Sequence, residues 1–270
     1  MSSELHEHMP DVANRIVSAT RLLILLDYDG TLCPIVDRPE DAHLPAMTKA
    51  LLQVLGGCPN VSLAIVSGRS LSDVRGRVGL SHLAYAGNHG MELNAAGIEW
   101  IEPRAAASRD ILNLLCGILE AMLRGIPQVK VENKGLTAAV HSRLVAPERL
   151  GEVHRIVHAA TAAVGQLFRV ATGHCVYEIL PIVNCNKGTA VKWIRELEEN
   201  APDLAVYLGD DETDEAAFLE LPDDITVRIG APLDTFARYH LPGPAEVQRC
   251  LSWIAKLRTN ADPEGPIPTI

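Results

Sequence analysis

The 270-residue sequence lacks the glycine-rich patterns that α/β proteins use to hold nucleotides. It has no Gly-x-Gly-x-x-Gly after an apolar run and no Walker lysine loop, which argues against a nucleotide-dependent or redox activity. Its six cysteines include no Cys-x-x-Cys pair and no finger-like Cys/His spacing. We therefore expect reduced, mostly buried thiols rather than a zinc site.

Positive charge is also in short supply. The sequence has 24 lysines and arginines against 34 aspartates and glutamates, which gives a net charge of −10. This balance argues against nucleic acid or an anionic membrane as the main partner. A small anionic ligand stays compatible with it, because a few local cations can outweigh the global field.

Long apolar stretches are absent as well. No window approaches the length of a transmembrane helix, and residues 1–19 carry Glu, His and Asp rather than a basic segment followed by an apolar one. We therefore expect a cytoplasmic protein without a signal peptide or a membrane partner. We also expect a monomer, with loose ends at the His/Glu-rich amino-terminal arm and at the Pro-rich residues 262–270.

The residues that are present point to a layered α/β fold. The sequence is 47% hydrophobic, and apolar runs at residues 22–26, 61–66 and 204–208 each end abruptly in polar residues. Such runs are typical of parallel strands buried on both faces. Between the last two runs lies a block with a different hydrophobic pattern, which predicts a helix over residues 105–124 followed by two strands.

This block then repeats the order helix, strand, strand, and its paired strands are joined by links too short for a parallel crossover. It should therefore be an antiparallel α+β module that is inserted into the parallel-sheet domain. We predict an α/β fold with a Rossmann-like parallel-sheet core, formed by residues 1–103 and 183–270 together, and an inserted α+β cap domain of order αββαββ at 104–182.

The first apolar run ends in Asp27-Tyr28-Asp29-Gly30-Thr31. Side chains alternate along an extended segment, so Asp27 and Asp29 should project to the same side. Two interpretations are open: a polar turn in which Asp and Gly serve turn chemistry, or a nucleophilic carboxylate beside an acid/base carboxylate. Ligands of open α/β sheets bind beyond the carboxyl ends of the strands, which is where this pair lies.

Three further polar segments follow apolar runs or begin helices: Ser67-Gly68-Arg69, Asn186-Lys187-Gly188 and 209–215. The last contains Asp210, Asp211 and Asp214, and by itself it could be a solvated acidic turn at a helix N-terminus. Several carboxylates that gather with Asp27 need a cation, and ligands made only of oxygen favour Mg²⁺. With Ser67 and Lys187 to hold an anion, these components suit phosphoryl transfer.

Together the four segments resemble the ordered motifs of the haloacid dehalogenase superfamily, and the insertion resembles its α/β-capped members. The resemblance implies a phosphoric monoester hydrolase in which Asp27 attacks phosphorus and Asp29 acts as acid and base. It also implies that Ser67, Gly68, Arg69 and Lys187 contact the phosphate of the substrate. Mg²⁺ would be bound by Asp27, the Asp29 carbonyl and Asp210, with Asp211 and Asp214 as ligands or just outside them.

Within this superfamily, residues 87–92, 132–135 and 141–143 resemble the trehalose-6-phosphate phosphatases. The resemblance implies that Glu132, Lys134 and Glu178 bind the sugar, although an ordinary strand with a polar outer face fits them too. Leu180 departs from the family's Glu-x-Arg-Pro pattern. The expected substrate is trehalose 6-phosphate, and the alternative is another glycosyl phosphate, such as a glucosylglycerol, sucrose or aminocyclitol-disaccharide phosphate. A non-catalytic phosphosugar sensor is disfavoured, because the nucleophile and the metal carboxylates are all present.

Overall fold

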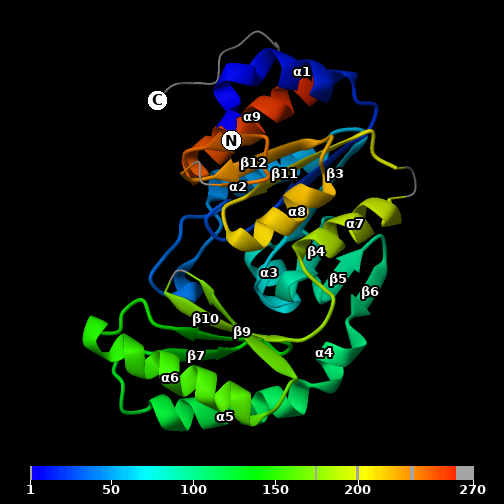
Figure 1. Ribbon diagram of the computed structural model, residues 1–270. Helices are drawn as coiled ribbons and strands as arrows, with labels where there is room; N and C mark the ends of the chain where they lie inside the picture. Colours follow the sequence, from blue (N-terminus) through cyan, green and yellow to red (C-terminus); the bar gives the residue numbers. More distant parts are fainter. Residues whose placement is uncertain (1, 174, 199–200, 232–233, 260–270) are drawn as a thin grey trace. The chain divides into compact units, whose positions relative to one another are not determined.

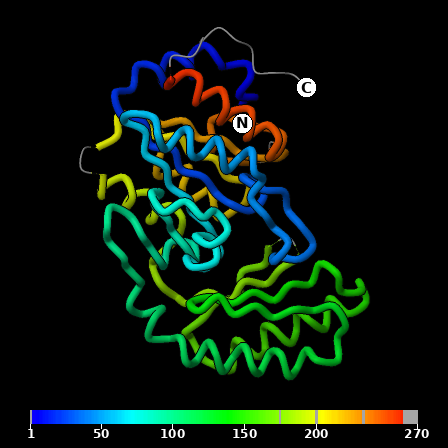
Figure 2. The backbone as a smooth tube through the Cα atoms, turned by 180° about the vertical axis from the view of Figure 1, so that it is seen from behind, coloured from blue at the N-terminus to red at the C-terminus, as the bar shows by residue number. Residues whose placement is uncertain are grey.

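The computed structural model describes residues 2–259 except 174, 199–200 and 232–233 (Figure 1). The chain divides into two compact units: a first unit of residues 1–100 and 185–270, and a second unit of residues 101–184. The expected boundaries of the insertion were 104 and 182. Trp100 stays with the first unit because its indole packs edge-on against Trp193, with 4.3 Å between ring centroids. The chain leaves the first unit once and returns once, as the colour order in Figure 2 shows.

The first unit is built on a nine-stranded sheet of order β1-β13-β12-β11-β2-β3-β4-β5-β6. Neighbours from β1 to β4 are parallel, and β5 returns antiparallel to β4. The strands are β1 (Ser3–Glu4), β2 (Leu22–Leu26), β3 (Val61–Val66), β4 (Ala84–Gly87), β5 (Glu92–Ala95), β6 (Ile98–Ile101), β11 (Leu204–Gly209), β12 (Ile225–Ile229) and β13 (Tyr239–Leu241).

Helices cover both faces of this sheet, which explains why its central strands are apolar without alternation. Leu22, Ile24 and Leu26 of β2 pack into one core, and Leu23 and Leu25 pack into the other. The first core is closed by α1 (Met9–Ser18), α2 (Ala46–Gly56), α3 (Leu71–Val78) and α9 (Pro244–Thr259). The second is closed by α7 (Lys187–Leu197) and α8 (Glu215–Glu220). Short 3₁₀ turns complete the unit: η1 (Leu5–His8), η2 (Pro39–Asp41), η3 (Asn88–Gly90) and η4 (Glu212–Asp214).

The second unit has an antiparallel sheet of order β7-β8-β10-β9 with helices on one face. Its strands are β7 (Lys130–Asn133), β8 (Ala138–His141), β9 (Phe168–Gly173) and β10 (Val176–Pro181), and its helices are α4 (Pro103–Ala107), α5 (Arg109–Leu123) and α6 (Pro147–Ala163). The predicted fold class is confirmed. The single helix expected over residues 105–124 is two helices, because the chain leaves helical geometry at Ser108, where α4 ends and α5 begins.

The amino-terminal segment forms regular structure from Ser3 onward, so the expectation of a loose His/Glu-rich arm was wrong. Val12 and Ile16 lie one turn apart on α1 and are buried in the first core together with Leu5. β1 adds to the sheet by parallel pairing with β13. The expected carboxyl-terminal loose end, residues 262–270, lies outside the described residues. Among the described residues, no helix is both long enough and apolar enough to cross a bilayer.

Candidate active site

The carboxyl end of the central strand β2 places Asp27 at the edge of the sheet. The Asp27 backbone N–H donates to the Leu208 carbonyl of β11 at 2.9 Å, which ties the tips of the two neighbouring strands together. Asp27 is only 3% exposed. A buried carboxylate needs a partner, because desolvation disfavours its charged form.

Lys187 supplies that partner. Its Nζ donates to Asp27 Oδ1 and to Asp214 Oδ1, both at 2.8 Å, and all three side chains are buried. Lys187 is the first residue of α7, whose start is fixed by reciprocal hydrogen bonds between Asn186 and Thr189. This capping box anchors the backbone from which the lysine reaches the carboxylates.

Asp214 is held from three sides. Besides Lys187, the Tyr207 hydroxyl donates to Asp214 Oδ1 at 2.6 Å, and the Asp211 N–H donates to Asp214 Oδ2 at 3.0 Å. Burial raises the pKa of Tyr207 well above its usual range, and Asp214 adds to this, so the phenol stays protonated and donates. These donors use most of the acceptor sites of one carboxylate. Asp214 therefore orients Lys187.

Burial also shifts the titration of the other acidic groups at the site. It raises the pKa of Asp27 well above its usual range against the opposing effect of Lys187, while Asp214 and Asp210 add repulsion. Burial, together with Asp214, raises the pKa of Asp210 to about 6. Burial alone would lower the pKa of Lys187, but Asp214 and Asp27 outweigh it and raise the pKa, which keeps the lysine charged. One cation thus faces three carboxylates.

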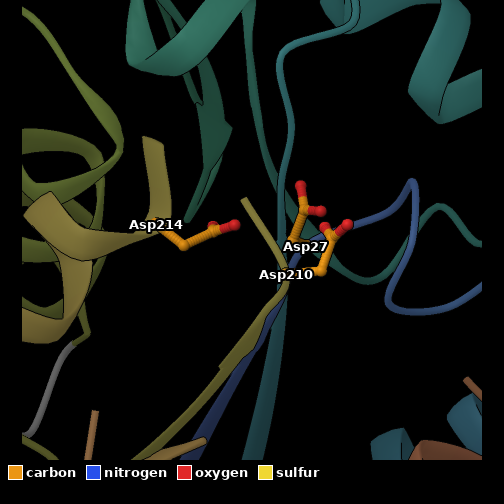
Figure 3. A group of neighbouring side chains, drawn as sticks. All are labelled: Asp27, Asp210 and Asp214. Atoms are coloured by element: carbon orange, nitrogen blue, oxygen red, sulfur yellow. The ribbon is translucent and has the colours of Figure 1, made fainter. Parts of the chain in front are cut away.

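This charge balance and the donor set fit a bound divalent cation. Carboxylate oxygens of Asp27, Asp210 and Asp214 lie within 4.8 Å of one another. Figure 3 shows the Asp27 and Asp210 carboxylates side by side and the Asp214 carboxylate pointing towards them. Asp210 Oδ1 is buried and has no hydrogen-bond partner among the described residues. Such an oxygen, beside a second carboxylate, is suited to a hard metal ion.

Gly30 makes room for this group. It has φ of +77°, and a Cβ built at this position would lie 1.9 Å from Asp210 Oδ2. Only a residue without a side chain therefore allows the Asp210 carboxylate to lie against the turn that follows β2. The glycine of the Asp27–Thr31 segment is thus explained by close approach as well as by backbone conformation.

Asp29 lies outside the buried group, with 42% of its side chain exposed. Arg69 donates to both of its carboxylate oxygens, from Nε at 2.7 Å and from Nη2 at 2.8 Å. The same guanidinium donates to Asp73 at 2.7 Å and to the Pro39 carbonyl at 2.9 Å. Four of its five N–H groups are therefore engaged. Arg69 is 7% exposed and fixes the orientation of Asp29.

Ser67 follows β3 and is 1% exposed. Its backbone N–H donates to Ala86, its carbonyl accepts from the His89 N–H, and its Oγ accepts from the Arg69 N–H at 3.1 Å. The hydroxyl proton is thus left to donate elsewhere. A Cβ at Gly68 would lie 2.6 Å from the His89 ring, so this glycine permits close packing of the two loops.

Asp211 is exposed, and its side chain does not belong to the buried group that the described residues form. It caps η4, and its carboxylate accepts from Thr213 Oγ1 at 3.1 Å. Its carbonyl accepts from Arg228 Nη1 at 2.7 Å, and the same nitrogen donates to Glu215 at 3.2 Å. These contacts hold the acidic loop to the end of β12.

The second unit carries a polar face on its sheet. The strand register aligns Glu132 and Glu178 on either side of Ala139, on the face opposite the apolar core. Lys134 Nζ donates to Glu178 Oε1 at 2.9 Å, and His141 Nε2 lies 2.8 Å from Glu132 Oε2. The three predicted sugar-binding residues therefore lie near one another. The pairing of Glu132 with His141 was not expected.

Two side-chain pairings that involve site residues were not predicted from the sequence. Tyr207 lies within an apolar strand, and its pairing with Asp214 depends on the turn of η4, seven residues later. His141 ends β8, and its pairing with Glu132 depends on the strand register. The alternation along β8 was the available signal, because it places His141 on the polar face together with Ala139.

A family model and several curated relatives place the chain in one family. A family model described as trehalose-phosphatase matches residues 25–232. The trehalose-phosphate phosphatase of Mycobacterium marinum is 38% identical over 241 residues, which cover 86% of this chain and 60% of that protein. The trehalose-phosphate phosphatase of Mycobacterium tuberculosis (strain H37Rv) is 37% identical over 248 residues, with 86% and 61% covered. The chain thus spans about three fifths of the length of these relatives.

A solved structure extends this likeness to the fold. The C-terminal domain of the C. albicans trehalose-6-phosphate phosphatase superposes with a TM-score of 0.79 at 25% identity. The alignment covers 94% of this chain and 98% of that domain, so both units have counterparts there.

Proposed function

The chain belongs to the trehalose-phosphatase family, and we propose that it hydrolyses trehalose 6-phosphate to trehalose and inorganic phosphate. The observation that carries the proposal is the buried group at the sheet edge, in which Asp27 pairs with Lys187 beside Asp210 and Asp214. This group combines a carboxylate nucleophile, a fixed cation and an acidic metal site.

Asp27 and Asp210 would hold the metal ion, for which we propose Mg²⁺. All-oxygen ligands favour Mg²⁺ over softer metals, and the orphaned Asp210 oxygen supplies a coordination site. Asp214, already occupied by Lys187, Tyr207 and Asp211, would orient the lysine from outside the coordination shell. When bound, Mg²⁺ neutralises charge on the phosphate and on the nucleophile.

In the first step, a carboxylate oxygen of Asp27 attacks phosphorus, and the bond between phosphorus and the sugar oxygen breaks. Protonated Asp29 gives its proton to the leaving sugar oxygen, and an aspartyl-phosphate remains on Asp27. In the second step, ionised Asp29 takes a proton from water, whose oxygen attacks phosphorus. The acyl-phosphate bond breaks, and inorganic phosphate leaves while the Asp27 carboxylate is restored.

The remaining residues at this edge position the reactants. The Ser67 hydroxyl, the Gly68 backbone and Lys187 contact phosphate oxygens, because hydroxyl, amide and ammonium donors stabilise the charge that develops there. Arg69 has four N–H groups engaged by Asp29, Asp73 and Pro39, so its contribution is to hold Asp29 rather than to bind phosphate. Asp211 contributes through its carbonyl, which anchors the acidic loop to Arg228.

Glu132, Lys134 and Glu178 bind the hydroxyl groups of the sugar. The two glutamates offer acceptors and Lys134 offers a donor on one sheet face. Lys134 is hydrogen-bonded to Glu178, and Glu132 lies within hydrogen-bonding distance of His141. A sugar hydroxyl can both donate and accept, so such a charged pair can exchange some of its internal hydrogen bonding for the ligand.

Phosphate release from a panel of sugar phosphates tests the proposal. The panel contains trehalose 6-phosphate and the glucosylglycerol, sucrose and aminocyclitol-disaccharide phosphates, each assayed with Mg²⁺ and with a chelator. We expect the highest kcat/KM with trehalose 6-phosphate, strict dependence on Mg²⁺, and a loss of at least about 10⁴-fold in kcat in Asp27→Asn.

Separate outcomes would contradict separate elements of the proposal. A higher kcat/KM for another member of the panel would change the substrate. Activity that persists in Asp27→Asn would contradict the aspartyl-phosphate mechanism. Activity that persists in the presence of the chelator would contradict the dependence on a metal ion.

A further inference from the structure

Helix α5 of the second unit has an apolar face that extends beyond its buried residues. Its inner side contributes five buried residues to the core of the unit: Leu112, Leu115, Cys116, Leu119 and Leu123. Next to this inner side the helix exposes Leu114, Ile118 and Met122, whose relative exposures are 62%, 38% and 48%. These three residues are spaced four apart and so form one continuous stripe along the helix. We call it the α5 stripe.

The neighbouring helix α6 shows that this is not the rule for the unit. α6 packs against the same core through Val153 and Val157. Its outer side carries charged and polar residues such as Arg149 and Arg155, and no large exposed hydrophobic residue lies among its described positions. The apolar face of a surface helix normally packs against the core, and its remaining surface is polar. The exposed part of the α5 apolar face, made by Leu114, Ile118 and Met122, has no such contact within the described residues.

We propose that the α5 stripe is a docking surface for a second copy of this chain, with the two α5 helices packed antiparallel about a twofold axis near Ile118. In this arrangement Leu114 of each copy faces Met122 of the other. Gly117 and Ala121 lie beside the stripe, where small side chains allow two helices to approach closely.

The charges at the ends of the stripe select this occupant and this direction. Asp110 lies in the first turn of α5, one turn before Leu114, and Arg124 is the carboxyl-terminal cap. Both are exposed, and neither forms an ion pair within the described residues of the chain. An antiparallel pair brings Asp110 of each copy next to Arg124 of the other, whereas a parallel pair would place like charges together.

The contact is small, which determines how it should be measured. A helix of 15 residues is about 22 Å long, so contact through α5 alone stays below the ~1,600 Å² of a standard protein interface. The dimer should therefore be reversible and depend on concentration, so that a dilute chain is the monomer expected from the sequence and a concentrated one is not. This inference rests on the second unit alone and does not depend on the proposed function.

Sedimentation velocity over two orders of magnitude of concentration tests the proposal. We expect the mass to rise from that of the 29.2 kDa monomer towards twice this value. Asp110→Arg and Arg124→Asp should each weaken self-association by about tenfold, because each places like charges in both contacts. When the two variants are mixed, their heterodimer should form as readily as the native dimer, since both contacts become complementary again.

Two further variants separate the stripe from general surface effects. Leu114→Glu should make the chain monomeric, whereas Arg155→Glu on the outer side of α6 should leave the association constant unchanged. Circular dichroism and phosphatase activity, which should not change in any of these variants, report on folding. A chain that is monomeric at every concentration overturns the proposal. So does a dimer that Leu114→Glu leaves intact, or a mixture without heterodimers.

Discussion

The two units carry ion pairs of similar composition in different surroundings. In the first unit, Lys187 and Asp214 have side-chain exposures of 3% and 0%, and their partners include the backbone and a buried phenol. In the second unit, Lys134 and Glu178 are 10% and 17% exposed, and they lie on a sheet face. The first group is buried and fixed by several hydrogen bonds, whereas the second is partly exposed on its sheet face. The first suits chemistry that needs fixed charges, and the second suits recognition of a hydroxylated ligand.

Removal of the cation from each group should separate them most strongly. Lys187→Met leaves Asp27 and Asp214 buried without a countercharge and should lower the free energy of unfolding by about 3–5 kcal/mol. Lys134→Met, the matched change in the second unit, should lower it by less than about 1 kcal/mol. Urea unfolding of both variants measures the difference. Equal losses would show that the two groups do not differ as described.

Two glycines of the same backbone conformation give the next largest contrast. Gly30 and Gly135 have φ of +77° and +85°, but a Cβ at Gly30 would overlap Asp210, whereas a Cβ at Gly135 would meet nothing within 4 Å. Gly135→Ala should cost about 1 kcal/mol from the left-handed conformation alone. Gly30→Ala should cost about 3 kcal/mol, because overlap with the carboxylate adds to this. Urea unfolding again supplies the measurement, and a Gly30→Ala variant no less stable than Gly135→Ala would contradict the packing.

The pH dependence of stability tests the burial of charge in the first unit. Because burial raises the pKa of Asp210 to about 6 in the folded chain, the fold favours the protonated carboxyl. Asp210 therefore contributes stability below its unfolded pKa, and this contribution is lost as pH rises through about 6. In the presence of a chelator, Asp210→Asn should exceed the native chain in unfolding free energy by about 2 kcal/mol at neutral to alkaline pH.

This advantage of Asp210→Asn should vanish as the pH falls towards the usual carboxyl pKa. Added Mg²⁺ should remove it at higher pH as well, because the ion stabilises only the native carboxylate. If the difference in unfolding free energy between Asp210→Asn and the native chain does not change with pH, burial of the ionised Asp210 carboxylate does not destabilise the fold.

The smallest expected effect concerns recognition by the second unit. Glu178→Gln keeps the shape of the side chain but weakens its bond to Lys134 and its affinity for a hydroxyl. We expect KM for trehalose 6-phosphate to rise about tenfold with little change in kcat, which corresponds to about 1.4 kcal/mol. Glu152→Gln, which changes a carboxylate of the same unit on α6, is the control and should leave both constants unchanged. A large fall in kcat in Glu178→Gln would give this residue a role in the chemistry.

The positions of the strand tips were accessible from sequence, and physical reasons explain why. Buried parallel strands must be apolar on both faces, so β2, β3 and β11 stand out, and the polar residues that follow them meet at one edge of the sheet. Asp27, Ser67 and Asp210 were found in this way. The inserted antiparallel unit was accessible as well, because short links cannot join parallel strands.

Other features depend on tertiary placement and leave no local pattern. β1 has two residues and β13 has three, too few to show periodicity, so the true edge of the first sheet was not foreseen. The sequence does not predict that Asp214 is buried with Asp27 while Asp211, three residues earlier, is exposed, because both lie in the same acidic turn. Nor could it tell that Arg69 would hold Asp29, which is forty residues away in the chain.

The ordered amino-terminal segment has a practical consequence for anyone who shortens this chain for expression. Deletion of residues 2–19 would remove the strand that pairs with the edge of β13. It would also expose the apolar surface that Leu5, Val12 and Ile16 now cover. An unpaired edge strand can form hydrogen bonds with strands of other molecules and so promotes aggregation. Tags and fusion partners are therefore better joined through a spacer ahead of Ser3 than in place of the segment that follows it.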